Sequence, residues 1–275
     1  MMKLAFSTLG CPGWTWNEIF AAAKDLGLDG IEIRGMGGEM FAPAIKCFLP
    51  ANREETVRQM KAAKMTFPML TSGACLGKPG ASPAMEEQSL EEAKAYVDLA
   101  AEIGAPYVRV MITPVAAPED ADIARAGENY AKICDYAKGT GVKPLIETNG
   151  VFCDSKVLRA FMEKADPLTS GVLWDIHHPY RFHGESPRET YDNIGRWVEY
   201  IHVKDSVMVD NKVVYRMMGY GDVPVMDTLK ILEDNGYDGY ISLEWMKRWC
   251  PDLQEPGIVF SHFQSYMNCL MGQLR

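Results

Sequence analysis

The stretch Gly171-Val-Leu-Trp-Asp175-Ile-His-His178 is the best guide to the fold of this sequence. It starts with an apolar run, as expected of a strand in a sheet whose two faces are both covered. An aspartate and two histidines lie at the end of this run. Buried strands that end in ionisable side chains are typical of parallel sheets whose carboxyl ends hold the functional residues.

The same unit, a short apolar run followed by a helical stretch, recurs along the chain. Apolar residues have helical spacing in Asn17–Leu28 and in Leu90–Ile103, and the second stretch stops at Gly104, as helix ends prefer. The predicted strands are Lys3–Ser7, Gly30–Arg34, Phe67–Thr71, Tyr107–Ile112, Lys143–Thr148, Gly171–Ile176, Tyr200–Lys204 and Tyr240–Glu244. Eight βα units predict an α/β fold, a (β/α)8 TIM barrel.

The length agrees with one such barrel. The chain has 275 residues, and a TIM barrel takes about 250. We therefore expect a single TIM-barrel domain over residues 1–275. A doubly wound open sheet is the alternative, but no Gly-x-Gly-x-x-Gly follows the first strand, and Gly35-Met-Gly-Gly38 after the second lacks a helix start.

Composition narrows the partners and the compartment. The chain has 28 Lys+Arg against 37 Asp+Glu, a net charge of −9, which disfavours nucleic acid as a partner. No apolar run is long enough to cross a membrane, and the N-terminus lacks a signal-peptide pattern, so we expect a cytoplasmic protein with no membrane partner. Seven scattered cysteines without Cys-x-x-Cys predict reduced thiols.

Strands five to eight each end in a potential metal ligand: Glu147, Asp175, His202 and Glu244. Neighbouring strands of a barrel would bring all four to its mouth. Taken singly, each is as readily a helix cap or an ion-pair partner. Together, three converging buried acids would repel one another unless a cation offsets them. Carboxylates and an imidazole predict a divalent metal ion, Mn²⁺ first, with Mg²⁺, Co²⁺ or Zn²⁺ as alternatives.

The contexts of these four residues, IETN, WDIHH, HVKD and SLEW, resemble the sugar phosphate isomerase/epimerase family of xylose-isomerase-like barrels. The resemblance covers nearly the whole chain. It implies one divalent ion on the four residues, with Glu147 and Glu244 also acting as a catalytic acid/base pair on a small sugar-like substrate. It further implies substrate contacts from His178 and from an arginine after strand seven, for which Arg216 is the nearest candidate.

One position departs from the ketose 3-epimerases of that family. They carry a further substrate-binding glutamate six residues after the first ligand, where this chain has Cys153. The reaction class therefore stays open between two alternatives. The first is a metal-dependent isomerase or epimerase of a sugar or sugar derivative, which moves a proton through an enediolate. The second is a lyase or dehydratase that acts on a keto-inositol, dehydroshikimate or oxidised glycoside through the same enediolate.

Two further classes fit less well. An endonuclease-IV-like DNA-repair enzyme shares the barrel but needs a multi-zinc cluster with more than the five histidines present, and a basic groove. A non-catalytic regulatory subunit would not need intact ligands. A homo-oligomer, a dimer or a tetramer, is compatible with the sequence.

Other residues near the predicted mouth are candidate substrate contacts. Arg109, in strand four, needs an anionic partner if it points into the barrel. Lys204 lies two residues after His202, so both side chains point to the same face of the strand. We expect it to serve either as a substrate anchor or in an internal salt bridge. Trp245 provides an aromatic wall for a sugar. Glu32 and Arg34 on strand two are expected to form structural ion pairs between strands. After strand seven, Val207–Tyr215 resembles a hairpin that would cover the site.

Overall fold

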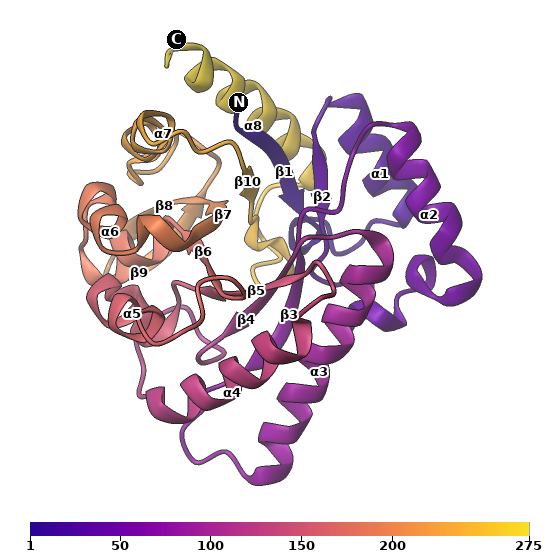
Figure 1. The fold of residues 1–275 in the computed structure, drawn as a ribbon. Coiled ribbons are helices and arrows are strands. Elements are labelled where there is room, and N and C mark those ends of the chain that lie inside the picture. The colour runs from indigo at the N-terminus through magenta and orange to yellow at the C-terminus, as the bar shows by residue number, and fades with distance from the viewer. Residues whose placement is uncertain (275) are drawn as a thin grey trace.

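Eight parallel strands form the centre of the structure, a computed structural model that describes residues 1–274 (Figure 1). They are β1 (Lys3–Ser7), β2 (Gly30–Glu32), β3 (Leu70–Cys75), β4 (Tyr107–Met111), β5 (Lys143–Glu147), β6 (Gly171–Asp175), β7 (Val198–Val203) and β10 (Tyr240–Leu243). Their order in the sheet is β2-β1-β10-β7-β6-β5-β4-β3. Parallel bridges from Gly30 to Thr66 and from Ile33 to Leu70 join the first strand of this order to the segment of the last, so the sheet curls into a barrel.

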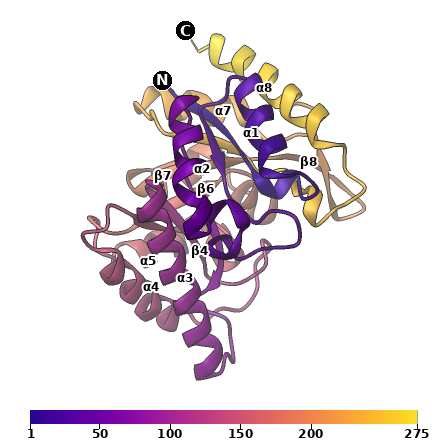
Figure 2. The same cartoon turned by 90° about the vertical axis from the view of Figure 1, so that its right-hand side faces the viewer.

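Helices surround this sheet on its outer side (Figures 1 and 2). They are α1 (Trp16–Asp25), α2 (Pro50–Ala62), α3 (Pro83–Ile103), α4 (Ile123–Ala137), α5 (Ser155–Met162), α6 (Pro187–Ile194), α7 (Val225–Asp234) and α8 (Pro256–Gly272). Local sequence sets their ends. Thr15 and Glu18 form a reciprocal capping box at the start of α1, and Gly104 ends α3 with a φ of 76°, a conformation that favours glycine.

The predicted (β/α)8 barrel is confirmed, and one strand is displaced from its predicted place. The sequence predicts a strand over Phe67–Thr71, whereas β3 begins at Leu70. Pro68 lies in the predicted segment and has no backbone N–H to donate to a ladder, so the strand becomes regular only after it. The predicted hairpin is also present, as β8 (Asp205–Val209) paired antiparallel with β9 (Lys212–Arg216).

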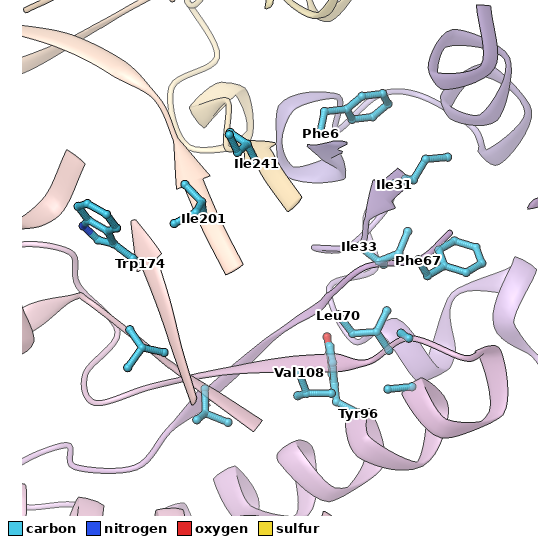
Figure 3. Packing of buried hydrophobic residues seen from close by; sticks show 14 of the residues in the cluster. Phe6, Ile31, Ile33, Phe67, Leu70, Tyr96, Val108, Trp174, Ile201 and Ile241 are labelled. Atoms are coloured by element: carbon cyan, nitrogen blue, oxygen red, sulfur yellow. The ribbon is translucent and has the colours of Figure 1, made fainter. Parts of the chain in front are cut away.

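The outward faces of the strands make the main apolar core. Figure 3 shows Phe6, Val108, Trp174, Ile201 and Ile241 among the side chains of this layer. All five are at most 1% exposed. The ring of Phe6 stacks on that of Phe260 from α8, with the ring centroids 4.0 Å apart. Packing of this kind fixes each strand in register, and with it the residues that point the other way.

The inward faces are layered along the barrel axis. A small buried cluster of Met69, Leu145, Leu173 and Tyr200 fills the interior. Residues two positions apart on a strand point to the same face. The next inward layer toward the carboxyl ends therefore holds Thr71, Glu147, Asp175 and His202. The apolar cluster therefore forms a dry floor beneath a ring of polar and ionisable groups.

Asp205, the first residue of β8, holds both ends of the hairpin segment together. Its Oδ1 accepts hydrogen bonds from the backbone N–H groups of Ser206 and Val223, and its Oδ2 from those of Gly219 and Gly221. The carboxylate is 2% exposed. Four backbone donors satisfy an acid that burial would otherwise destabilise.

Two further expectations concern the whole chain. No helix among residues 1–274 is long and apolar enough to cross a membrane. All seven cysteines are free thiols, as the sequence predicts, and Cys11, Cys47, Cys134 and Cys153 are buried.

We expect Gly221→Ala to destabilise the fold by about 1–3 kcal/mol, the usual cost of overpacking. The new Cβ would lie 2.0 Å from Asp205 Oδ1 and 2.5 Å from the carbonyl oxygen of Ser206. The matched control is Gly257→Ala, in the first turn of α8, where a Cβ meets nothing within 4 Å. Urea unfolding of both variants measures the difference, and equal stabilities would contradict the clamp described for Asp205.

Candidate metal and substrate site

Glu147, Asp175, His202 and Glu244 converge at the carboxyl ends of their strands. Each offers one ligand atom, and these atoms all lie within 4.8 Å of one another. His202 Nδ1 is 3.9 Å from Glu147 Oε1, 3.9 Å from Asp175 Oδ2 and 3.7 Å from Glu244 Oε1. The four residues are between 0 and 6% exposed. One imidazole nitrogen thus faces three carboxylate oxygens inside the protein.

The three acids are also held from outside this cluster. Arg109 Nη1 donates to Glu147 Oε2 at 2.8 Å, which leaves Oε1 directed toward His202. Lys204 donates to Asp175 Oδ2 and to Glu244 Oε2. These buried cations lower the cost of removing the carboxylates from water. They also fix the carboxylates in place, because a charged donor holds each one from a known side.

Glu32 orients the histidine from below. His202 Nε2 is 2.9 Å from Glu32 Oε2, and Glu32 Oε1 accepts the Thr71 hydroxyl at 2.8 Å. His202 Nδ1, although buried, has no hydrogen-bond partner among the described residues. Metal-binding histidines adopt this arrangement: one imidazole nitrogen is hydrogen-bonded to a carboxylate, and the other faces the metal site. Sequence reasoning expected Glu32 in a structural ion pair between strands and did not identify His202 as its partner.

Burial and charge shift the protonation of the cluster in different directions. Burial would raise the pKa of Glu244, but the charges of Lys204, His202 and Arg109 outweigh it and hold that pKa well below its usual value. For His178, burial and the charge of Lys204 lower the pKa to about 3. His178 is therefore neutral at physiological pH. Its Nδ1 donates to the carbonyl oxygen of Thr148 at 3.1 Å, which leaves Nε2 as a hydrogen-bond acceptor.

The residues fit a divalent metal ion. The unpartnered His202 Nδ1 and the three oxygens that face it supply one nitrogen and three hard oxygen donors. Such a set suits Mn²⁺, Mg²⁺, Co²⁺ or Zn²⁺. Glu147, Asp175, His202 and Glu244 are thus the side chains that would hold the ion.

A cavity of about 180 Å³ opens beside the cluster. Glu147 and Glu244 line it, together with His178, Arg109 and Asn149. Its other walls are Leu9, Arg34, Met111, Pro114, Ala116, Met246 and Trp249. A larger apolar cavity of about 1010 Å³ lies outside the barrel between α4 and α5, and none of the predicted site residues lines it.

The other predicted residues have different surroundings. Lys204 is 1% exposed and makes internal salt bridges with Asp175 and Glu244. Trp245 is also 1% exposed, and its indole N–H donates to Gln254 O, away from the cavity walls. Trp249, four residues later, lines the cavity instead. Since Trp245 and Trp249 lie on the same segment after β10, their order in the sequence gave no signal of which one faces inward.

Arg216 lies at the end of β9, opposite Asp205 in the hairpin register. Its guanidinium donates to the carbonyl oxygen of Tyr215 and is half-buried. It does not line the cavity. Cys153 is fully buried, and its thiol faces the carbonyl oxygen of Ala116 at 3.2 Å.

We expect Glu32→Gln to weaken divalent-metal binding by about 10–100-fold, the usual effect of losing a carboxylate behind a ligand histidine. Isothermal titration calorimetry with Mn²⁺ measures the affinity. Glu199→Gln is the matched control, because Glu199 pairs with Lys143 at the amino end of β7, outside the cluster. Unchanged affinity in Glu32→Gln would show that Glu32 does not support a metal ligand.

Comparisons with known proteins agree with the fold. The chain is similar to fructoselysine 3-epimerase of Shigella flexneri, with 26% identity over 258 residues that cover 88% of this chain and 90% of the relative. The fold resembles the crystal structure of the IOLI protein with a bound zinc atom, with a TM-score of 0.80 at 13% identity, covering 100% of this chain and 99% of that one. It also resembles the probable 3-DHS dehydratase AsbF of Bacillus anthracis, with a TM-score of 0.78 at 15% identity, covering 97% and 99%.

The two structural likenesses are below 25% identity and show the fold alone. The family model described as xylose isomerase-like TIM barrel matches residues 20–260, which is most of the chain. The barrel and its strand-end residues have already been described on independent grounds. The chain belongs to the xylose isomerase-like TIM barrel family.

Proposed function

We propose that the protein is a divalent-metal-dependent isomerase or epimerase of a sugar or sugar derivative. The observation that carries this proposal is the convergence of three carboxylate oxygens on the unpartnered Nδ1 of His202, next to a cavity that Glu147 and Glu244 line. The similarity to fructoselysine 3-epimerases over 88% of the chain supports a sugar epimerase. Mn²⁺ is the ion we propose, with Mg²⁺, Co²⁺ and Zn²⁺ compatible with the same donors.

The metal, bound by Glu147, Asp175, His202 and Glu244, would polarise the carbonyl of a hydroxyketone and so acidify the neighbouring C–H. The protein's own part is the movement of the proton. β7 and β6 separate the strands of the two glutamates in the sheet, so Glu147 and Glu244 approach the cavity from the two ends of the cluster. A group on either side of one carbon is what inversion requires.

In the proposed reaction, one glutamate takes the proton from the carbon next to the carbonyl. The electron pair of the broken C–H bond forms a double bond between this carbon and the carbonyl carbon, and the carbonyl electrons move to the oxygen. The product is the enediolate. The opposite glutamate must be protonated when the substrate binds; if it gives its proton to the same carbon, that carbon is inverted, which is epimerisation. Return of the first glutamate's proton to the adjacent carbon gives aldose–ketose isomerisation. Arg109 and Lys204 orient the two glutamates, and neutral His178 would hold a substrate hydroxyl.

A lyase or dehydratase is the second candidate. Cys153 occupies the position at which the ketose 3-epimerases have a further substrate-binding glutamate, and its buried thiol is not among the residues that line the cavity. The site therefore lacks one polar contact expected for an epimerase. If a β-hydroxyl left the enediolate as water, with the proton that a glutamate had taken from the carbon, the same groups would catalyse dehydration.

Arg216 and Trp245 are kept as proposed substrate-site residues because of their position in the fold alone. Arg216 lies on the hairpin that follows β7; its guanidinium does not line the cavity, and we propose that a bound substrate draws it in. Trp245 contributes through packing behind the cavity, and Trp249 is the aromatic wall that a sugar would contact.

We also propose a cytoplasmic location, because a reducing compartment would keep seven cysteines as free thiols.

We expect the Mn²⁺-loaded protein to exchange a substrate C–H for deuterium in D₂O, observed by NMR with a panel of ketoses. Glu147→Gln and Glu244→Gln should each slow this exchange by about 10²–10⁴-fold, because each removes a proton carrier. Glu199→Gln, outside the site, should exchange at the wild-type rate. No exchange with any hydroxyketone or keto acid would contradict both candidate functions, and full activity of the double variant would exclude the glutamates.

We expect Arg216→Ala to raise KM about 10-fold or more and to change kcat less, since lost hydrogen bonds to a charged donor weaken binding by that order. Lys212→Ala, at the exposed other end of β9, is the matched control. Steady-state kinetics on whichever ketose supports deuterium exchange measure both constants. Unchanged kinetics in Arg216→Ala would remove this residue from the site.

A further inference from the structure

Arg34 lines the cavity from the side opposite the metal-ligand strands. It follows β2 by two residues, at the carboxyl end of the barrel, where its backbone N–H donates to the Thr8 hydroxyl at 2.8 Å. Its side chain is half-buried and forms part of the cavity wall. The mechanism proposed above assigns it no role.

Arg34 differs from the other cations of the site in having no partner. Arg109 pairs with Glu147 and donates to Ser72 O at 2.5 Å, and Lys204 pairs with two acids. Within residues 1–274, the guanidinium of Arg34 forms no ion pair and donates no hydrogen bond. Five N–H donors on a charged, partly desolvated group are therefore left without an acceptor.

The surroundings add to this cost. Burial and the nearby charge of Arg109 lower the pKa of Arg34 to about 10, and Glu92 and Glu244 act on it only through longer-range charge. Glu92 is occupied elsewhere, since its Oε1 accepts the Gly73 N–H at 2.6 Å. A guanidinium beside a like charge in a cleft is costly unless an anion reaches it.

The charge of the whole site points the same way. With a divalent ion bound, His202 would be a neutral ligand, and four acids would then face three cations: Glu32, Glu147, Asp175 and Glu244 against Arg34, Arg109 and Lys204. A divalent cation on the acids would leave one more positive charge than negative. Electrostatic complementarity then favours a ligand that carries a negative charge.

We propose that Arg34 binds an anionic group of the substrate, a carboxylate or a phosphate, at the β2 side of the cavity. This inference rests on the proposed function and narrows it to hydroxyketones with a negative charge at the end remote from the carbonyl. The hydroxyketone end lies at Glu147 and Glu244, and the anionic end accepts the guanidinium N–H donors. A single free guanidinium matches the two oxygens of a carboxylate in a bidentate pair.

The cavity size limits the rest of this molecule. At about 180 Å³ it is below the roughly 300–1,000 Å³ of pockets that take drug-sized ligands. Leu9, Met246 and Trp249 give it apolar walls, and its second cation, Arg109, is paired with Glu147. A small sugar acid or sugar phosphate suits a cavity of this size.

Calorimetric binding to the Mn²⁺-loaded protein tests this inference with three probes: D-fructose, D-fructuronate and D-fructose 6-phosphate. They share a ketose and differ in charge at the remote carbon. We expect at least one anion to bind about 10–100-fold more tightly than D-fructose, the range of a charged hydrogen bond. Arg34→Met should remove this preference with D-fructose binding unchanged, whereas Arg34→Lys should keep part of it.

Arg58→Met is the matched control, because Arg58 is exposed on α2 and pairs only with Glu55. It should keep the full preference, and thermal unfolding should show that all variants fold. The anion that shows the preference identifies the group, carboxylate or phosphate. No preference for either anion in the wild type, or the same preference in Arg34→Met, would overturn the inference.

Deuterium exchange separates this inference from the proposed function. If no probe exchanges but anion binding still depends on Arg34, the isomerase or epimerase assignment fails and the anion site stands. If D-fructose exchanges and Arg34→Met binds all three probes as the wild type does, the catalytic proposal stands and Arg34 has no role in anion binding.

Discussion

Three carboxylates share the dry mouth of this barrel, and the cost of their mutual repulsion governs the arrangement of everything around them. Each acid directs one oxygen toward His202 Nδ1. Arg109 and Lys204 bind the other oxygens of Glu147 and Glu244, and Lys204 also donates to Asp175. Burial favours the protonated form of a carboxylate, and these cations oppose that effect. The acids converge on one point with cations beside them, which is the condition for binding a divalent ion.

This arrangement depends on the layers beneath it. Leu145, Leu173 and Tyr200 lie two residues before Glu147, Asp175 and His202, and form the apolar floor that excludes water from below. The outward residues between them anchor the same strands to the helices. Because side chains alternate strictly along a strand, a shift of one residue would put the ligands into the outer core and the apolar residues into the mouth. Packing on the outside therefore specifies the chemistry on the inside.

The sequence predicts much of this because the relevant signals are local. Apolar runs locate the strands, and the residue that ends each run is a candidate ligand, so the four ligand positions needed only the assumption of a closed barrel. The start of β3 was displaced by Pro68, a local effect that the apolar pattern conceals.

Which side chains pair with which of the proposed metal ligands could not be predicted from the sequence. Glu32 and His202 are far apart in the chain and meet only through closure of the barrel. Arg34 was expected in a structural ion pair between strands, but β2 ends two residues before it and its side chain joins the cavity wall instead. Which of Trp245 and Trp249 faces the cavity depends on the short turn after β10, Met246–Arg248, which apolar periodicity does not resolve. Long-range pairing and irregular loops are the limits of such reasoning.

The clamp at Asp205 also bears on how this barrel can diversify. Both ends of the hairpin are tied to one carboxylate that directly follows Lys204, while the turn at Asp210 and Asn211 lies free of that clamp with φ angles of 48° and 60°. Lengthening or reshaping the turn would leave the base of the hairpin, and so Lys204, in place. The tip is thus a module that evolution can alter independently of the acids, so that the range of accepted molecules can change while the reaction is retained.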